Sequence, residues 1–221
     1  MSKPDTATTK RVTSDWGAAL PGFSEWRPLR LLRRIGPVVQ GVTLDRTTEG
    51  GGYFPTVHIH ALVQEFPVIS LTLGQRMVTP SGVQESVSFA RHSNECQSAA
   101  RRLVAQSRLS LEEPPTIASI VEALCERVSL RQEKGLPPAV RELEDGLLIA
   151  AAAGEPTLVE SGLRLARQMV DVWPKSRLPL DWKGSDIWLT DLEERIADPS
   201  VLSDVVEQQI SLHKLVKVPA V

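Results

Sequence analysis

The chain contains 221 residues, of which 42% are hydrophobic and 24% are charged, as expected for an ordinary folded protein that buries a core. No apolar run approaches the roughly 20 residues needed to cross a bilayer, and the first residues lack the apolar middle of a secretory signal. The two cysteines, Cys96 and Cys125, form neither a metal-ligand pattern nor a disulfide framework. We therefore expect a cytoplasmic protein that makes no membrane contact and holds no cofactor.

The small net charge of −2 hides a division between the two halves of the chain. Residues 1–110 contain 13 Lys and Arg against 8 Asp and Glu, a balance of +5, whereas residues 111–221 contain 12 against 19, a balance of −7. A concentration of one charge sign in one part of a chain favours association with a partner of opposite charge.

The first 35 residues give weak signals. Residues 1–14 are polar and without periodicity, and we expect them to form a disordered leader. Residues 27–35 alternate arginine with leucine and isoleucine, and Pro28 suits a first helical turn, so a short basic amphipathic segment is expected there.

The pattern of residues 36–77 is the clearest indication of a sheet. Apolar side chains alternate with polar ones at about 53–63 and again at 66–77, and a preceding strand is expected at 38–45. The short connection between the second and third strands predicts an antiparallel pair. We expect a fourth strand at about 83–90; the alternative is that this segment begins the next helix.

Beyond residue 92 the apolar spacing changes to that of helices. We expect a helix from Ser93 that packs across the sheet, followed by five more; these lie at about 117–128, 137–151, 156–173, 186–197 and 201–215. The last two are expected to be capped by Ser185 and Ser200. The predicted class is α+β: a small antiparallel sheet of three to four strands packed with helices in the N-terminal half, and an all-helical bundle in the C-terminal half. We expect a sheet domain at 15–110 and a helical domain at 111–221, or one continuous domain.

Two histidines suggest a metal site. His58 and His60 are two residues apart on a predicted strand, so both imidazoles are expected on its outward polar face, where they could share a metal or bind a phosphate. A metal centre needs further ligands, and His92 and His213 have no suitable spacing. An ordinary sheet surface is the competing interpretation.

Charged and aromatic residues provide the other candidate sites. An arginine cluster could contact nucleic acid or an acidic partner, although no stacking series accompanies it; it consists of Arg27, Arg30, Arg33 and Arg34. Acidic side chains opposite the apolar stripes of two helices are candidates for binding a basic partner; they are Glu142, Glu144, Asp145 and Glu160. Three indoles fall in a short span, at Trp173, Trp182 and Trp188, and indoles suit both bundle cores and protein interfaces.

No catalytic constellation stands out from these patterns. We therefore predict a cytoplasmic, bacterial-type protein-binding module for a basic partner, for example an immunity-type protein that neutralises a basic nuclease toxin. The first alternative is an enzyme that handles a metal or a phosphate substrate at His58 and His60. The second is a nucleic-acid-associated protein that uses the arginine cluster. The sequence leaves the oligomeric state open.

Overall fold

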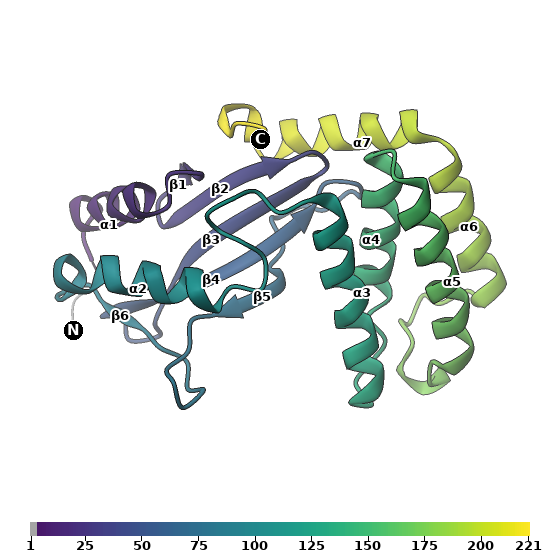
Figure 1. Ribbon diagram of the computed structural model, residues 1–221, viewed down its shortest axis with the longest axis horizontal. Helices are drawn as coiled ribbons and strands as arrows, with labels where there is room; N and C mark the ends of the chain where they lie inside the picture. The colour runs from purple at the N-terminus through teal and green to yellow at the C-terminus, as the bar shows by residue number, and fades with distance from the viewer. Residues whose placement is uncertain (1–3) are drawn as a thin grey trace. The chain divides into compact units, whose positions relative to one another are not determined.

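The computed structural model describes residues 4–221 and shows an α+β protein, as predicted (Figure 1). It contains a six-stranded sheet and seven α-helices. The chain divides into two compact units. The sheet unit comprises the residues up to His60 together with Val68–Pro115 and Lys214–Val221, and the helical unit comprises Ala61–Pro67 and Thr116–His213.

A helix replaces most of the expected disordered leader. Helix α1 spans Thr6–Ala19 and begins at Asp5, whose carboxylate accepts a hydrogen bond from the Thr8 amide at 2.7 Å. Its buried residues are Thr9, Val12, Thr13 and Trp16. This spacing of three and four is that of one helical face, and the two threonines in it made the stripe look polar. Residues 1–3 lie outside the described part of the chain.

The arginine-rich segment forms a β-hairpin and not a helix. Strand β1 (Ser24–Arg27) pairs antiparallel with β2 (Arg30–Ile35). At the turn Leu29 adopts φ +63°, a left-handed conformation that normally favours glycine or asparagine. The Leu29 side chain is buried and its amide donates to Thr13 Oγ1 at 2.8 Å, so tertiary contacts hold a turn that local sequence does not favour.

The predicted strands complete the sheet. They are β3 (Val38–Arg46), β4 (Gly52–Ala61), β5 (Thr72–Arg76) and β6 (Val87–Ser88). The order is β1-β2-β3-β4-β5, and β6 also pairs with β4. The β4 and β5 strands are antiparallel, as predicted, and the last strand ends at Ser88. Within residues 4–221 no strand lies between 115 and 215, which confirms the predicted change from sheet to helix.

Helices α1 and α2 (His92–Gln106) pack with the sheet around one hydrophobic core. Trp16 and Tyr53 are its largest fully buried aromatic side chains, and Cys96 and Leu103 contribute from α2. Cys96 is buried in this core, and burial raises the pKa of its thiol to about 11.

The helical unit contains the five helices expected from the periodicity. They are α3 (Ile117–Glu133), α4 (Val140–Ala152), α5 (Pro156–Val172), α6 (Ser185–Ala197) and α7 (Pro199–Leu212). Asp198 caps α7 in place of Ser200, and Gly184 precedes α6 at the position expected for Ser185. Helix α4 contacts all four of the others, and its residues Asp145–Ala151 are buried without interruption. A helix buried on every side belongs at the centre of a bundle.

The chain passes between the units more than once. Residues 61–67 leave the sheet to join the helical unit, and after α7 the segment Lys214–Val221 belongs to the sheet unit. There the amide of Val221 donates to the Arg34 carbonyl at 3.0 Å, and Ala220 forms a parallel bridge with Arg34. A single predicted boundary at residue 110 assigns neither residues 61–67 to the helical unit nor residues 214–221 to the sheet unit, because both assignments depend on long-range contacts.

Candidate functional site

The histidine pair is buried, which overturns the expected outward polar face. His58 and His60 are each 1% exposed. The His58 ring lies against Gly41, where a β-carbon would come within 2.4 Å of Nε2, and its Nε2 lies 3.1 Å from Thr43 Oγ1. His60 Nδ1 accepts a hydrogen bond from the Ser70 amide at 3.2 Å. Glycine opposite His58 thus allows a large polar ring to pack flat inside the sheet.

This environment does not resemble a metal centre. Burial lowers the pKa of His58 to about 4, so the imidazole is neutral at physiological pH. Among residues 4–221 no three His, Cys, Asp or Glu side chains lie close enough together to hold a metal ion. Both histidines are buried in the sheet unit, with His58 Nε2 near the Thr43 hydroxyl and His60 Nδ1 near the Ser70 amide.

Within the arginine cluster, Arg33 belongs to the interior and not to a binding surface. It is fully buried, with its guanidinium 4.5 Å above the Phe23 ring. Its Nε donates to Gln40 Oε1 at 2.8 Å, and its Nη2 donates to the carbonyls of Ser110 and Glu113 at 2.7 and 2.9 Å. Burial lowers the Arg33 pKa to about 10, which still leaves the side chain charged. The residue ties β2 to the 110–113 segment.

The other three arginines of the cluster differ in their exposure and contacts. Arg34 is half-buried, and its Nε donates to the Val218 carbonyl at 3.0 Å. Arg27 is exposed and lies over the Trp26 ring at 4.1 Å, and Arg30 is exposed. The cluster therefore offers two exposed cations and not four, which weakens it as a nucleic-acid contact.

A buried chain of hydrogen bonds joins α1, β4 and α2. Trp16 Nε1 is a donor without an acceptor function, so it donates to the Tyr53 hydroxyl at 2.9 Å. The Tyr53 hydroxyl is hydrogen-bonded to His92 Nδ1 at 2.7 Å, and His92 Nε2 is hydrogen-bonded to Asp15 Oδ2 at 2.9 Å. Burial raises the Tyr53 pKa. Since Trp16, Tyr53 and His92 are fully buried, this chain links α1, β4 and α2 inside the core, and we assign it a structural role.

The acidic candidates are separated by the structure. Asp145 is 2% exposed, so it belongs to the interior and not to the polar surface where the helical pattern had placed it. It accepts from Gln64 Nε2 at 2.8 Å and lies 3.9 Å from Arg141 Nε. Burial raises its pKa to about 6. Glu160 is exposed on α5, as expected.

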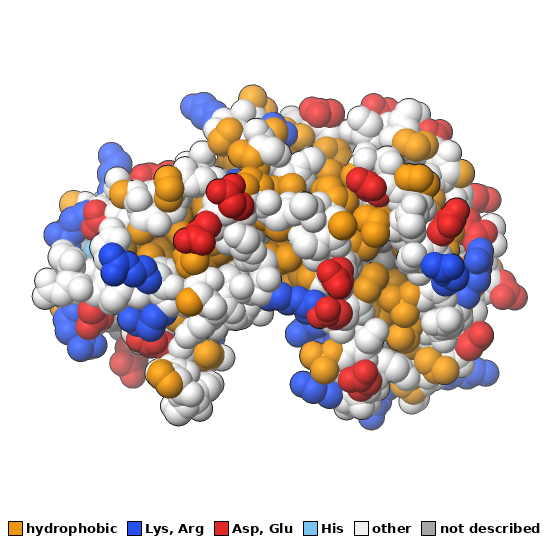
Figure 2. Space-filling view, viewed as in Figure 1, with side chains coloured by type: hydrophobic (Ala, Val, Ile, Leu, Met, Phe, Trp, Pro, Cys, Tyr) orange, Lys and Arg blue, Asp and Glu red, His pale blue; other side chains and the backbone are white. Residues whose placement is uncertain are grey.

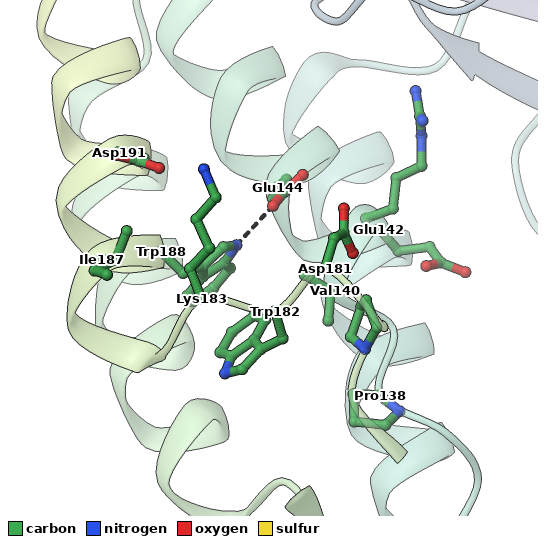
Figure 3. A pocket seen from close by; sticks show the side chains of 12 residues that line it. Pro138, Val140, Glu142, Glu144, Asp181, Trp182, Lys183, Ile187, Trp188 and Asp191 are labelled. Carbon is green, nitrogen blue, oxygen red and sulfur yellow. Dashed lines mark hydrogen bonds between the residues drawn. The ribbon is translucent and has the colours of Figure 1, made fainter. Parts of the chain in front are cut away.

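Glu142 and Glu144 are brought to a pocket within the helical unit (Figure 3). The cavity has a volume of about 450 Å³, in the range of small-ligand sites. The first turns of α4, the link before α6, and α6 itself form its walls. The lining residues used below are Arg141, Glu142, Glu144, Asp181, Trp182, Lys183, Trp188 and Asp191.

Aromatic contacts order one wall of the pocket. Trp173, Trp182 and Trp188 form a mutual cluster with ring centroids 5.4 to 5.8 Å apart. Trp173 is buried, whereas the other two are half-buried and line the pocket. Trp188 Nε1 donates to Glu144 Oε1 at 2.6 Å, the dashed line in Figure 3. One of the three indoles therefore belongs to the core of the helical unit, and two are partly exposed at its surface.

The pocket carries more negative than positive charge. Its four carboxylates are on Glu142, Glu144, Asp181 and Asp191, and its two cations are on Arg141 and Lys183. Arg141 is engaged elsewhere, since its guanidinium lies 4.1 Å over the Phe66 ring and near Asp145. No hydrogen bond or ion pair within residues 4–221 engages the side-chain carboxylates of Glu142, Asp181 or Asp191. These carboxylates are available to a ligand.

Glu142 and Glu144, predicted from the sequence as binding residues, line this pocket, but most of the other lining residues were not predicted. Asp181, Lys183 and Asp191 gave no signal, because they lie about 40 or more positions from Glu142 and meet it only through packing. The cluster of tryptophans was the available signal, as indoles are enriched in interfaces. The tryptophan cluster indicated the part of the helical unit in which the pocket lies, but not the residues that line the pocket.

The charge division follows the structural units. The sheet unit contains 15 Lys and Arg against 9 Asp and Glu, a balance of +6, and the helical unit contains 10 against 18, a balance of −8. Figure 2 shows acidic side chains interspersed with basic ones over the visible face and not gathered in one patch. The pocket is therefore a more specific feature than the overall charge.

Neither the comparisons with known proteins nor the search for membrane-spanning helices identifies a class for this chain. None of the helices in residues 4–221 combines the length and apolar character needed to traverse a bilayer. Searches against protein-family models, curated protein sequences and solved structures find no match, so any functional proposal must rest on the geometry and charge described above.

Proposed function

We propose that the chain is a protein-binding module whose helical unit binds a basic protein. The observation that carries the proposal is the pocket of the helical unit, in which unpaired carboxylates lie beside two half-buried indoles. Indoles at a surface supply contact area with little loss of side-chain freedom, and they are enriched in the energetic centres of interfaces. Carboxylates around them favour a cationic partner.

The net charge of the helical unit also favours a basic partner. A balance of −8 attracts a basic protein at long range and raises its association rate. A basic nuclease toxin neutralised by an immunity-type protein is the concrete form of this proposal. The buried histidines and the buried Arg33 give no comparable support to the enzyme or nucleic-acid alternatives.

The test begins with identification of the partner. Immobilised protein is exposed to a lysate of the cell that encodes it, the retained protein is identified and purified, and association is measured between 0.1 and 1 M salt. Because the Debye length shrinks from about 10 Å to about 3 Å over this range, the association rate is expected to fall at least about tenfold. A partner with an acidic surface, or a rate that is independent of salt, would contradict the proposal.

A matched pair of charge reversals locates the interaction. Glu142→Lys places a cation in the pocket and is expected to slow association about tenfold or more, since like charges repel at an interface. Glu49→Lys makes the same change in charge at an exposed position of the sheet unit and is expected to have little effect. Equal slowing by both variants would indicate an effect of net charge alone and would remove the role of the pocket.

A further inference from the structure

The pocket has the chemistry of a receptor for one planar cation. Its cavity of about 450 Å³ is large enough to bury a single side chain, and two indoles form part of its wall. A guanidinium stacks on indole faces and is more weakly hydrated than an ammonium, so it loses less on leaving water. The same group offers five donors in a plane, which suits carboxylates that approach from different elements.

The carboxylates are placed on three different segments. Glu142 comes from α4, Asp181 from the link and Asp191 from α6, and all three line the cavity without a partner among residues 4–221. Glu144 is held in place by the Trp188 indole. A cation that enters the pocket can therefore meet acceptors from three segments of the helical unit.

We propose that this pocket receives the guanidinium of an arginine side chain, and, resting on the function proposed above, that this arginine belongs to the basic partner. The guanidinium stacks against Trp182 or Trp188 and donates hydrogen bonds to Glu142 and Asp181. Lys183, which also lines the pocket, is an internal cation that competes with the ligand. The pocket therefore sets a preference for arginine over lysine, in addition to the charge attraction of the whole unit.

The test uses the full chain and three small probes: the N-acetyl amides of arginine, lysine and citrulline. Citrulline has nearly the shape of arginine but no charge, and lysine has the charge but no planar group. Binding is followed by tryptophan fluorescence and by the indole N–H resonances of Trp182 and Trp188. We expect arginine to bind in the millimolar range, lysine several-fold more weakly, and citrulline without saturation. Equal responses to all three probes would overturn the assignment.

Variants separate the pocket from the rest of the acidic surface. The double variant Glu142→Gln with Asp181→Asn is expected to weaken arginine binding about tenfold, as expected for the loss of two ion pairs. Glu160→Gln, which neutralises an exposed carboxylate outside the pocket lining, is the matched control and should bind as the wild type does. Lys183→Gln should strengthen binding several-fold. Unchanged binding in the double variant would overturn the proposal.

The two proposals fail in different ways. Absence of arginine binding, combined with salt-dependent association of the basic partner, would remove the pocket assignment and leave the binding function. If arginine binds and the variants change its affinity as expected, but the partner is not basic, the pocket assignment would be supported and the proposed function contradicted.

Discussion

Strand β2 in the sheet unit and helix α4 in the helical unit use their charged residues in different ways. Each places one charged side chain in the interior, Arg33 in β2 and Asp145 in α4. Arg33 remains charged, because its donors are satisfied by Gln40 and backbone carbonyls. Asp145 has one amide donor at short range and a distant guanidinium, and burial raises its pKa to about 6. A buried cation with five donors can be solvated by carbonyls, whereas a buried carboxylate needs N–H groups that this bundle does not supply as fully.

The remaining charges of the two elements also differ. Arg34 is half-buried and donates to a carbonyl of the C-terminal segment, so it adds to the fold. Glu142 and Glu144 are half-buried at a pocket, and Glu142 has no partner among residues 4–221. A charge that the fold does not satisfy is available for binding. The comparison thus separates structural charges from candidate functional ones.

The largest expected effect is at Arg33. Arg33→Ala removes a buried guanidinium and leaves several carbonyls without a donor, which is expected to lower the free energy of unfolding by about 4 kcal/mol. Urea unfolding followed by circular dichroism measures the change. Arg30→Ala, on the same strand but exposed, should alter stability by less than about 0.5 kcal/mol. Similar values for the two variants would refute the structural role of Arg33.

The next effect is a pH dependence from Asp145. Its pKa in the folded protein is about 6 against a reference value of 3.8, so between these values the folded state holds more protons than the unfolded state. Stability from this residue is therefore present at low pH and falls as the pH rises from about 4 to about 7. The loss is about 2 kcal/mol.

Asp145→Asn provides the measurement. Asparagine can still accept a hydrogen bond from Gln64 but does not titrate, so the variant should gain about 2 kcal/mol relative to the wild type between pH 4 and pH 7. Urea unfolding of both proteins at the two pH values gives this difference without interference from other titrating groups. Parallel pH profiles would show that Asp145 does not titrate in this range.

A smaller difference is expected between two glutamates of α4. Glu144→Ala removes the acceptor of the Trp188 indole and is expected to cost about 1 to 2 kcal/mol in unfolding free energy, because a partly buried N–H is left without its charged partner. Glu142→Ala removes no internal bond and should cost less than about 0.5 kcal/mol. The near-ultraviolet circular dichroism of the tryptophan cluster should change in the Glu144 variant alone. An unchanged spectrum would mean that Glu144 does not hold the indole.

The smallest effect is expected at Glu160. Its carboxylate is exposed on α5, and Glu160→Lys should change the unfolding free energy by only a few tenths of a kcal/mol. Thermal unfolding measures the shift. A loss above about 1 kcal/mol would show that this helix face has a structural contact, and it would remove Glu160 as a neutral control.

Local patterns in the sequence determined the fold class and most of the elements. Alternating residues around Val57 and Ile59 predicted the strands, and spacings of three and four after residue 117 predicted all five helices of the helical unit. Pro156 marked the start of α5, and Gly154, which has a positive φ, marked the end of α4. Such signals are reliable because periodicity and backbone preference act within one turn or one strand.

Tertiary structure alone decided which polar residues are buried and where the candidate site lies. The hairpin at Leu29 depends on the hydroxyl of Thr13, and His58 is buried because Gly41 leaves room for its ring. The pocket joins Glu142 to Asp181 and Asp191, which are far apart along the chain. The sequence shows that a residue is charged but not whether carbonyls, another side chain or water surrounds it. Only packing determines the surroundings of each charged side chain.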